Sequence, residues 1–380
     1  MIYLDNNSTT QIDKDVLDEM MPYLNEMYGN SASRTHKFGW EANDAVKLSR
    51  ERVSSLINAK PDEIIFTSGS TEGINFLIKG VYDQYSDKGN HIITVKTEHK
   101  AILDVCSYLE NKGAEITYLN VNEDGLIDLE ELKKAITAKT VLISVMYANN
   151  ETGVVQEIKE IGNIARKNDV FFMTDATQAV GKIPVDVVED NIDLLTLSAH
   201  KLHGPKGVGA VYIKRQFPKI KVTPLLHGGG HEKGYRSGTI NVPGIVGLGK
   251  ASEIAKKNHP KYENVLKLRN QLEEELCKIK GVALNGDKDN RLPNTTNISI
   301  DGVDAEALII KIRNEFAIAS GSACTSAEVL PSHVIMAMYS DEEKAYSSIR
   351  ISLGKNITEE DLTHFKSYIL NKINKIRVII

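Results

Sequence analysis

Cysteine is scarce in this sequence, and long apolar runs are absent. The 380 residues include only Cys106, Cys277 and Cys324, and no two of them form a C-x-x-C pair. So few cysteines exclude a disulfide framework, and their spacing offers no structural zinc or iron–sulfur site. No segment reaches the roughly 18 consecutive apolar residues of a membrane helix, and no basic region precedes an apolar stretch at the N-terminus. We therefore expect a soluble, cytoplasmic protein without a membrane partner.

An excess of charge of one sign is also lacking. The formal net charge is −5, and no long block of like charge occurs. This gives no electrostatic reason to expect a nucleic acid as a direct partner. The chain does have length, since 380 residues with 41% hydrophobic content exceed what one hydrophobic core usually supports. We therefore expect two domains.

The first two thirds of the sequence alternate between strand and helix patterns. Short β-branched runs occur at 63–68, 91–97, 115–121, 140–148, 170–176, 193–198 and 209–214. Between them, segments 43–57, 100–113 and 157–168 carry apolar residues at helical spacing. This rhythm predicts an α/β fold in which helices cover a parallel or mixed sheet.

The pattern changes near residue 250. Segment 251–281 predicts long helices broken at Pro260, and strand and helix patterns follow over residues 296–376. A second, smaller α+β domain is expected from there.

A lysine and an aspartate follow two of the predicted strands. Asp175 ends strand 170–176, and Lys201 lies between strand 193–198 and a Gly/Pro turn. In open α/β sheets, ligands bind beyond the carboxyl ends of the strands. Pyridoxal phosphate needs such a pair, a lysine for the Schiff base and an aspartate for the pyridine nitrogen. The residues alone leave open a surface role for Lys201 and a helix-cap role for Asp175.

A phosphate site should accompany this pair. Residues 63–80 predict a strand, a Gly/Ser/Thr turn and a helix start. The N–H groups of residues 69–71, with the hydroxyls of Ser70 and Thr71, could hold a phosphate dianion at the positive helix end. The turn is neither a Walker loop nor a G-x-G-x-x-G motif. An ordinary strand-to-helix turn remains the alternative.

Further motifs follow one another between residues 3 and 354. In order they are YLDNNSTT, GNSASRTHKFGW, FTSGSTEGIN, KTEHKAILD, NNETGVVQ, TDATQAVGKIPVD, SAHKLHGPKGVGA, HGGGHEKGYRSGT, SGSACTS and SSIRISLG. Together they resemble the pyridoxal-phosphate-dependent cysteine desulfurases of the NifS/IscS type, within the class-V aminotransferase family. The resemblance implies a type I aminotransferase fold and a homodimer. It also implies a large cofactor-binding domain, 13–255, with a mainly parallel seven-stranded sheet, and a small domain, 1–12 with 256–380, that carries the catalytic cysteine.

The resemblance assigns a role to each matching residue. It implies that the catalytic residues are Lys201, His99 and Cys324. The implied cofactor-binding residues are Ser70, Thr71, His99, Asn150, Asp175, Gln178, Ser198, His200, Lys201 and, from the other subunit, Thr239. The implied substrate-binding residues are Asn30, Asn150 and Arg350. Without the resemblance, a capping role for His99 and a surface ion pair for Arg350 stay open.

The three cysteines differ in their surroundings. Cys106 shares a helical stripe with apolar residues, and Cys277 follows Leu276 in an apolar helix, so both are expected to be structural. Cys324 has no such periodicity and lies among Gly, Ser, Ala and Thr, a composition suited to a loop that carries a thiol between two positions.

The resemblance also implies the reaction. L-Cysteine would be converted to L-alanine, and its sulfur would pass to Cys324 as a persulfide and then to an acceptor protein. That acceptor would be an iron–sulfur scaffold or another sulfur-using partner, and Cys324 would ligate a cluster only transiently. The alternatives are a selenocysteine lyase, an ordinary aminotransferase and a sulfur carrier without turnover. Ser8 and Ser31 depart from the family pattern, in which alanine and proline are usual, and their effect would fall on the rate.

Overall fold

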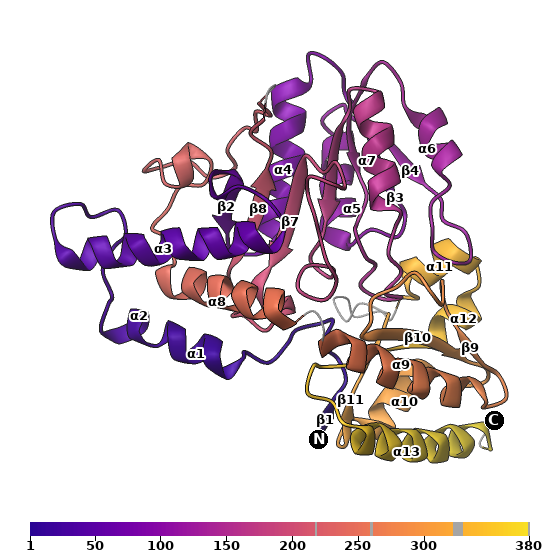
Figure 1. The fold of residues 1–380 in the computed structure, drawn as a ribbon. Coiled ribbons are helices and arrows are strands. Elements are labelled where there is room, and N and C mark those ends of the chain that lie inside the picture. The colour runs from indigo at the N-terminus through magenta and orange to yellow at the C-terminus, as the bar shows by residue number, and fades with distance from the viewer. Residues whose placement is uncertain (217–218, 259–260, 322–329, 379–380) are drawn as a thin grey trace.

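The computed structural model describes residues 1–216, 219–258, 261–321 and 330–378. Its centre is a seven-stranded sheet in the order β2-β8-β7-β6-β5-β3-β4 (Figure 1). The strands are β2 (Ile64–Thr67), β3 (His91–Val95), β4 (Glu115–Leu119), β5 (Thr140–Ser144), β6 (Phe171–Asp175), β7 (Leu194–Ser198) and β8 (Gly209–Ile213). Strand β8 runs antiparallel to β2 and β7, and the other pairs are parallel. The predicted seven-stranded, mainly parallel sheet is confirmed.

Helices cover both faces of this sheet. Strands β2, β3, β5, β7 and β8 are buried along their whole length, which requires apolar cover on both sides. One face packs against α4 (Ser70–Tyr85) and α5 (Lys100–Glu110). The core on the other face includes residues of α1 (Lys14–Met20), α3 (Lys37–Leu56), α6 (Leu129–Ala135), α7 (Ile158–Lys167) and α8 (Val242–Asn258). Short helices α2 (Pro22–Asn25), η1 (Pro61–Glu63), η2 (Ala199–Lys201) and η3 (Glu232–Gly234) lie in the connections.

The C-terminal part has its own sheet and buried core, in the lower part of Figure 1. Four antiparallel strands follow the order β12-β13-β10-β9, and β1 (Ile2–Tyr3) pairs in parallel with β11 (Phe316–Ala317). The four are β9 (Val282–Leu284), β10 (Thr295–Ile300), β12 (Ala319–Ser320) and β13 (Ser348–Ser352). Helices here are α9 (Lys261–Cys277), α10 (Ala305–Ile312), α11 (His333–Tyr339), α12 (Glu342–Tyr346) and α13 (Glu359–Arg377).

The change of pattern near residue 250 corresponds to a change of core. Helix α8 contributes to the core on one face of the large sheet, whereas α9 contributes to the C-terminal core. The two helices flank the predicted break, and Pro260 itself lies outside the described residues. Leu4, although N-terminal, is buried in the C-terminal core. The domain boundaries at 12/13 and 255/256 stay a prediction.

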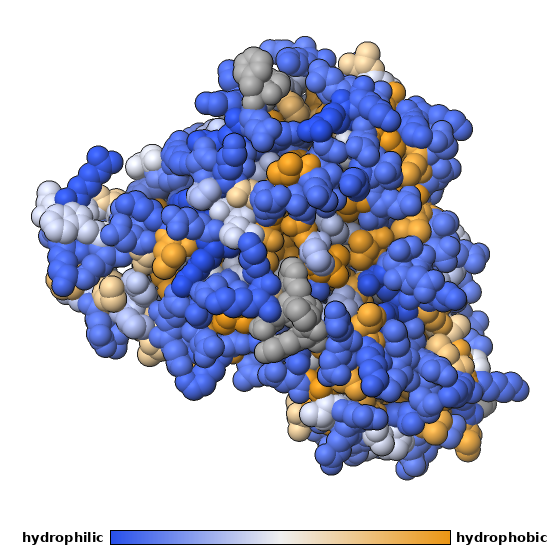
Figure 2. Space-filling view, viewed as in Figure 1, coloured by the Kyte–Doolittle hydropathy of each residue, from blue (hydrophilic) through white to orange (hydrophobic). Residues whose placement is uncertain are grey.

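The surface is mostly polar. Figure 2 shows a largely hydrophilic face on which apolar residues gather near the junction of the upper and lower parts. Among the residues that the structure describes, no helix is both long and apolar enough to cross a membrane.

Candidate active site

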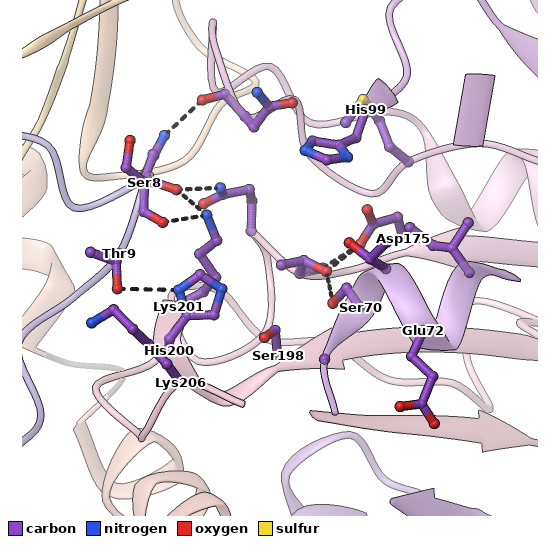
Figure 3. Close-up of a pocket in the computed structure, with 18 of the residues that line it drawn as sticks. Ser8, Thr9, Ser70, Glu72, His99, Asp175, Ser198, His200, Lys201 and Lys206 are labelled. Carbon is purple, nitrogen blue, oxygen red and sulfur yellow. Dashed lines mark hydrogen bonds between the residues drawn. The ribbon is translucent and has the colours of Figure 1, made fainter. Parts of the chain in front are cut away.

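A cavity of about 630 Å³ lies at the carboxyl ends of the large sheet's strands. Its lining comes from residues that follow β2, β3, β5, β6 and β7, joined by residues 7–9 and by Arg350 of β13. Asp175 and Lys201, predicted to share one edge of the sheet, both line it (Figure 3). The other predicted site residues that line this cavity are Ser70, Thr71, His99, Asn150, Gln178, Ser198, His200 and Arg350.

Lys201 extends from η2, directly after β7, into this cavity. Its Nζ donates hydrogen bonds to the backbone oxygens of Asn7, at 2.5 Å, and Ser8, at 2.8 Å. Burial and the positive charge of Arg350 lower the pKa of Lys201 to about 8, although Asp175 acts in the opposite direction. About a tenth of the amine is therefore neutral at pH 7, enough to act as a nucleophile. Lys201 is not the solvated surface lysine that the sequence left open.

Asp175 ends β6, is 6% exposed, and lines the cavity. Its Oδ1 accepts hydrogen bonds from the backbone N–H of Thr177, at 2.9 Å, and from the Thr177 hydroxyl. The Thr177 and Ser70 hydroxyls lie 2.5 Å apart (Figure 3). A turn and no helix follows Asp175, so the helix-cap role left open by the sequence is wrong; the carboxylate caps this turn and also lines the cavity.

The turn between β2 and α4 has the geometry of an anion site. Gly69 adopts φ 152° and ψ −178°, a region that is essentially open only to glycine. The helix begins at Ser70, and the first N–H groups of a helix have no partner inside it. The Ser198 hydroxyl lies beside this turn, 3.6 Å from the position that a Cβ on Gly69 would take, and His200 lines the same cavity. The pKa of His200 is lowered to about 4 by burial and by Lys201, so its ring is neutral at pH 7.

An ion pair ties this turn to the segment that contains Thr239. Arg236 Nε lies 2.9 Å from Glu72 Oε1, and Glu72 Oε2 accepts the Ser68 N–H at 2.9 Å. Burial alone would raise the pKa of Glu72, but the hydrogen bonds from Arg236 and Ser68 lower it overall. Glu72 therefore stays an anion that Arg236 neutralises, and it does not oppose an anion at the helix start.

His99 both caps α5 and faces the cavity. Its Nδ1 accepts the Ala101 N–H at 3.1 Å, so in the neutral ring the proton lies on Nε2. Burial lowers the pKa of His99, with Asp175 opposing and Lys201 adding to the effect. The ring is therefore neutral near pH 7 and can take part in proton transfer. His99 therefore both caps α5, the role left open from the sequence, and lines the cavity.

Arg350 lies in β13, is 7% exposed, and reaches the cavity from the C-terminal part. Its Nη1 donates to the backbone oxygen of Asn150 at 2.9 Å. Its Nη2 donates to Asp5 Oδ1, at 2.7 Å, and to Ser8 Oγ, at 2.8 Å. The Nε is buried without a partner among the described residues. A buried guanidinium with an unused N–H is able to take a carboxylate.

Three predicted site residues are not brought into this cavity. Asn30 is exposed and its Oδ1 accepts the N–H of Ala32 at 2.9 Å. Thr239 is exposed and lines no part of the cavity within this chain. Cys324 lies outside the described residues. The roles predicted for these residues stay predictions.

The other two cysteines differ from each other. Cys106 is buried in the core, and burial raises the pKa of its thiol to about 12. Both observations agree with the structural role expected of it. Cys277 ends α9 and is exposed, so it is not part of the core. Its helix buries Leu268, Leu272 and Leu276, but the thiol lies off that stripe.

Sequence reasoning missed several residues that shape the site. The backbone oxygen of Asn7 accepts hydrogen bonds from Lys201 Nζ and Gln178 Nε2, and Lys182 donates to Asn7 Oδ1. The fully buried Glu98 precedes His99, and burial and Asp175 raise its pKa well above the ordinary range. The motifs contained these residues, but no pattern in the sequence distinguished them. Within the described residues, no group of three His, Cys, Asp or Glu side chains could hold a metal ion.

The chain is similar to known proteins in its family model, in its sequence and in its fold. Residues 2–365 match the family Aminotransferase class-V. The chain is 50% identical over 377 residues to cysteine desulfurase IscS of Neisseria meningitidis serogroup A, covering 99% of this chain and 93% of the relative. A solved NifS-like protein superposes with a TM-score of 0.91 at 38% identity, over 100% of both chains. SspA in complex with cysteine superposes with a TM-score of 0.82 at 36% identity, over 93% of this chain and 99% of the other.

Proposed function

Because this chain belongs to the class-V aminotransferase family, we propose that it is a pyridoxal-phosphate-dependent cysteine desulfurase. It converts L-cysteine to L-alanine and delivers the sulfur to an acceptor for iron–sulfur cluster assembly or another sulfur-containing cofactor. One observation carries the proposal. The Lys201 amine, with a pKa of about 8, lies in a single cavity with the Asp175 carboxylate and the Arg350 guanidinium.

The cavity residues fit pyridoxal phosphate group by group. Lys201 would hold the aldehyde carbon, and Asp175 would hold the pyridine nitrogen in its protonated form. The N–H groups at the start of α4 would hold the phosphate dianion, with the hydroxyls of Ser70, Thr71 and Ser198 and the neutral ring of His200. Gln178 would donate to the phenolic oxygen, and His99 would lie against the ring. When bound, the cofactor supplies the electron sink that makes the substrate's α-proton acidic.

The chain's own residues position the substrate and move its protons. Arg350 and Asn150 would hold the substrate carboxylate, using the guanidinium Nε–H that has no partner among the described residues. His99 Nδ1 is occupied by the Ala101 N–H, so proton exchange with the substrate would take place at Nε2. The neutral amine of Lys201, once released, is a second base at the same place.

Cys324 would accept the sulfur. Its thiolate attacks the sulfur of the substrate, the C–S bond breaks, and the carbon retains the electron pair and gains a proton. L-Cysteine and the enzyme thiol thus become L-alanine and the enzyme persulfide, with no external oxidant or reductant. The thiolate is the form that attacks, so alanine formation should slow as the pH is lowered.

The proposed assembly is a cytoplasmic homodimer. Thr239 is exposed beside the Arg236–Glu72 ion pair and could reach the phosphate site of a second copy. The region from α1 to the start of α3 exposes a group of large apolar side chains that a second copy could cover. They are Leu17, Met21, Leu24, Tyr28, Phe38 and Trp40. Asn30 belongs to this region, so its predicted substrate role also requires the dimer.

The test uses L-cysteine labelled with ³⁴S and mass spectrometry of the intact and digested protein. A mass increase of one sulfur on the peptide that contains Cys324, with release of alanine, is expected. Cys324→Ala should bind the cofactor normally and release alanine poorly, and Lys201→Ala should lose the borohydride-reducible absorption band. A wild type that cannot hold pyridoxal phosphate, or turnover that survives Cys324→Ala, would contradict the proposal. Release of keto acid in place of alanine would identify an aminotransferase.

A further inference from the structure

Lys182 is a second buried lysine beside the active site. It is 3% exposed and does not line the cavity. Its Nζ donates to Gln178 Oε1, at 2.6 Å, and to Asn7 Oδ1, at 3.1 Å. A buried lysine is costly and needs a reason to be retained. Burial, Lys201 and Arg350 lower its pKa far below the ordinary value, yet a charged and a neutral amine can both donate these two hydrogen bonds.

The first of these hydrogen bonds fixes the direction of the Gln178 side chain. An amide can turn about its last bond and exchange its oxygen for its nitrogen at little intrinsic cost. Lys182 presents N–H donors, so Gln178 Oε1 must face Lys182. The Gln178 Nε2 group then points the other way, donates one N–H to the Asn7 backbone oxygen at 2.9 Å, and keeps one N–H. Gln178 lines the cavity, so that N–H is available there.

The second hydrogen bond fixes Lys182 itself. Asn7 Oδ1 also accepts from Asn294 Nδ2 at 3.3 Å, and Asn7 Nδ2 donates to Thr295 Oγ1 at 2.9 Å. The Asn7 side chain is therefore held by the C-terminal part of the molecule. Lys182 Nζ lies between this fixed oxygen and the Gln178 oxygen and has little freedom to release either.

We propose that Lys182 is a positioning residue that sets the orientation of the Gln178 amide, so that Gln178 offers a donor, not an acceptor, to the bound cofactor. This inference rests on the proposed function, because it concerns the phenolic oxygen of pyridoxal phosphate. That oxygen carries negative charge, so a donor stabilises it and an acceptor repels it. Lys182 touches neither cofactor nor substrate and acts only through Gln178.

The test is a double-mutant cycle on Lys182 and Gln178 with cofactor binding and the absorption spectrum as readouts. Lys182→Met, which keeps length and apolar volume, should weaken pyridoxal phosphate binding about tenfold. It should also change the cofactor's absorption spectrum to resemble that of Gln178→Ala. In the Gln178→Ala background, Lys182→Met should weaken pyridoxal phosphate binding less than about twofold, because Gln178, through which Lys182 acts, is already absent.

A control separates this role from a contribution to stability. Lys214 is partly buried, forms an ion pair with Asp193 at 2.9 Å, and does not line the cavity. Lys214→Met should lower the melting temperature and leave the cofactor spectrum unchanged. If Lys182→Met does not fold, Lys182→Gln retains an N–H donor and should show a smaller change of the same kind.

Two outcomes would overturn the inference while the proposed function stands. One is a wild-type spectrum in Lys182→Met. The other is an equal loss of cofactor affinity with and without Gln178, which would mean that Lys182 supports the fold alone. Failure of the wild type itself to bind pyridoxal phosphate would instead contradict the proposed function.

Discussion

The two walls of the cavity are built in different ways. The cofactor wall, made of Ser70, His99, Asp175, Ser198 and Lys201, belongs to the large sheet, and each residue lies at or soon after the end of a strand. The substrate wall, made of Asn7, Ser8 and Arg350 and supported by Asp5, which pairs with Arg350, joins two segments more than 340 positions apart. The side chains of the cofactor wall are placed by local backbone, whereas those of the substrate wall depend on tertiary contacts.

Two charged residues, one from each wall, act on Lys201 in opposite directions. Burial lowers the pKa of Lys201 most, and Arg350, from the substrate wall, lowers it further. Asp175, from the cofactor wall, raises it, as does Asp5, and the result is a pKa of about 8. The nucleophilicity of Lys201 therefore depends on the opposed effects of Arg350 and Asp175, and each of these residues can be altered separately.

The largest effect is expected on the cofactor wall. Asp175→Asn removes the carboxylate that would keep the pyridine nitrogen protonated, while an amide oxygen can still accept the Thr177 N–H. We expect kcat for alanine formation to fall about 10³-fold with a smaller change in KM, since the lost interaction is an electrostatic one in the reacting state. Steady-state kinetics measure both. A kcat within tenfold of wild type would show that Asp175 is mainly a turn cap.

A change to the substrate wall should appear in KM. Arg350→Met removes the guanidinium and leaves the carboxylate of Asp5 without its partner. We expect KM for L-cysteine to rise about 100-fold, in line with loss of a charge-paired contact, while cofactor affinity changes little. Arg350→Lys keeps the charge but not the two-pronged geometry, so its KM should lie between those of the wild type and Arg350→Met. Equal loss of cofactor and substrate affinity would mean that the walls are not separable.

The balance at Lys201 can be measured in the cofactor-free protein. Only the neutral amine captures pyridoxal phosphate, so the capture rate should rise with pH through about 8. In Arg350→Met the midpoint should move up, and in Asp175→Asn it should move down by a smaller amount, because Arg350 has the stronger effect on Lys201. Stopped-flow absorbance across pH 6–10 gives the midpoints. Shifts of the same sign in both variants would contradict the opposed effects of Arg350 and Asp175.

The smallest effect concerns Ser8. Nη2 of Arg350 donates to both Asp5 and Ser8, so a substrate carboxylate that binds Nη2 must displace one of them, and the neutral hydroxyl is the easier one. Ser8→Ala should therefore lower KM about three- to fivefold at unchanged kcat. This is the change expected when the substrate no longer has to break one modest hydrogen bond. Ser8→Thr keeps the hydroxyl and serves as the control. A rise in KM for Ser8→Ala would show that the hydroxyl holds Arg350 in place.

The cofactor wall could be predicted from the sequence because its rule is local. Strand patterns located Asp175 and Lys201, and parallel strands place their carboxyl ends at one edge. The role of Arg350 came from family resemblance, since an arginine in a strand carries no signal of its own. Asn7 and Lys182 could not be recognised. A lysine is usually exposed, and nothing near Gly181 shows that this one packs against an asparagine from the other end of the chain.

Asn7 has a further consequence for the order in which the protein is assembled. Its backbone N–H donates to Ser352 Oγ at 2.9 Å, and its side chain bonds Thr295 and Asn294. During synthesis residue 7 leaves the ribosome long before these partners exist, although the strands of the large sheet are already available to fold. The cavity can therefore be completed only after residue 352 has emerged. In a nascent chain the carbonyl groups of Asn7 and Ser8, which accept from the Lys201 amine, would for some time lack the C-terminal contacts that hold Asn7 in place.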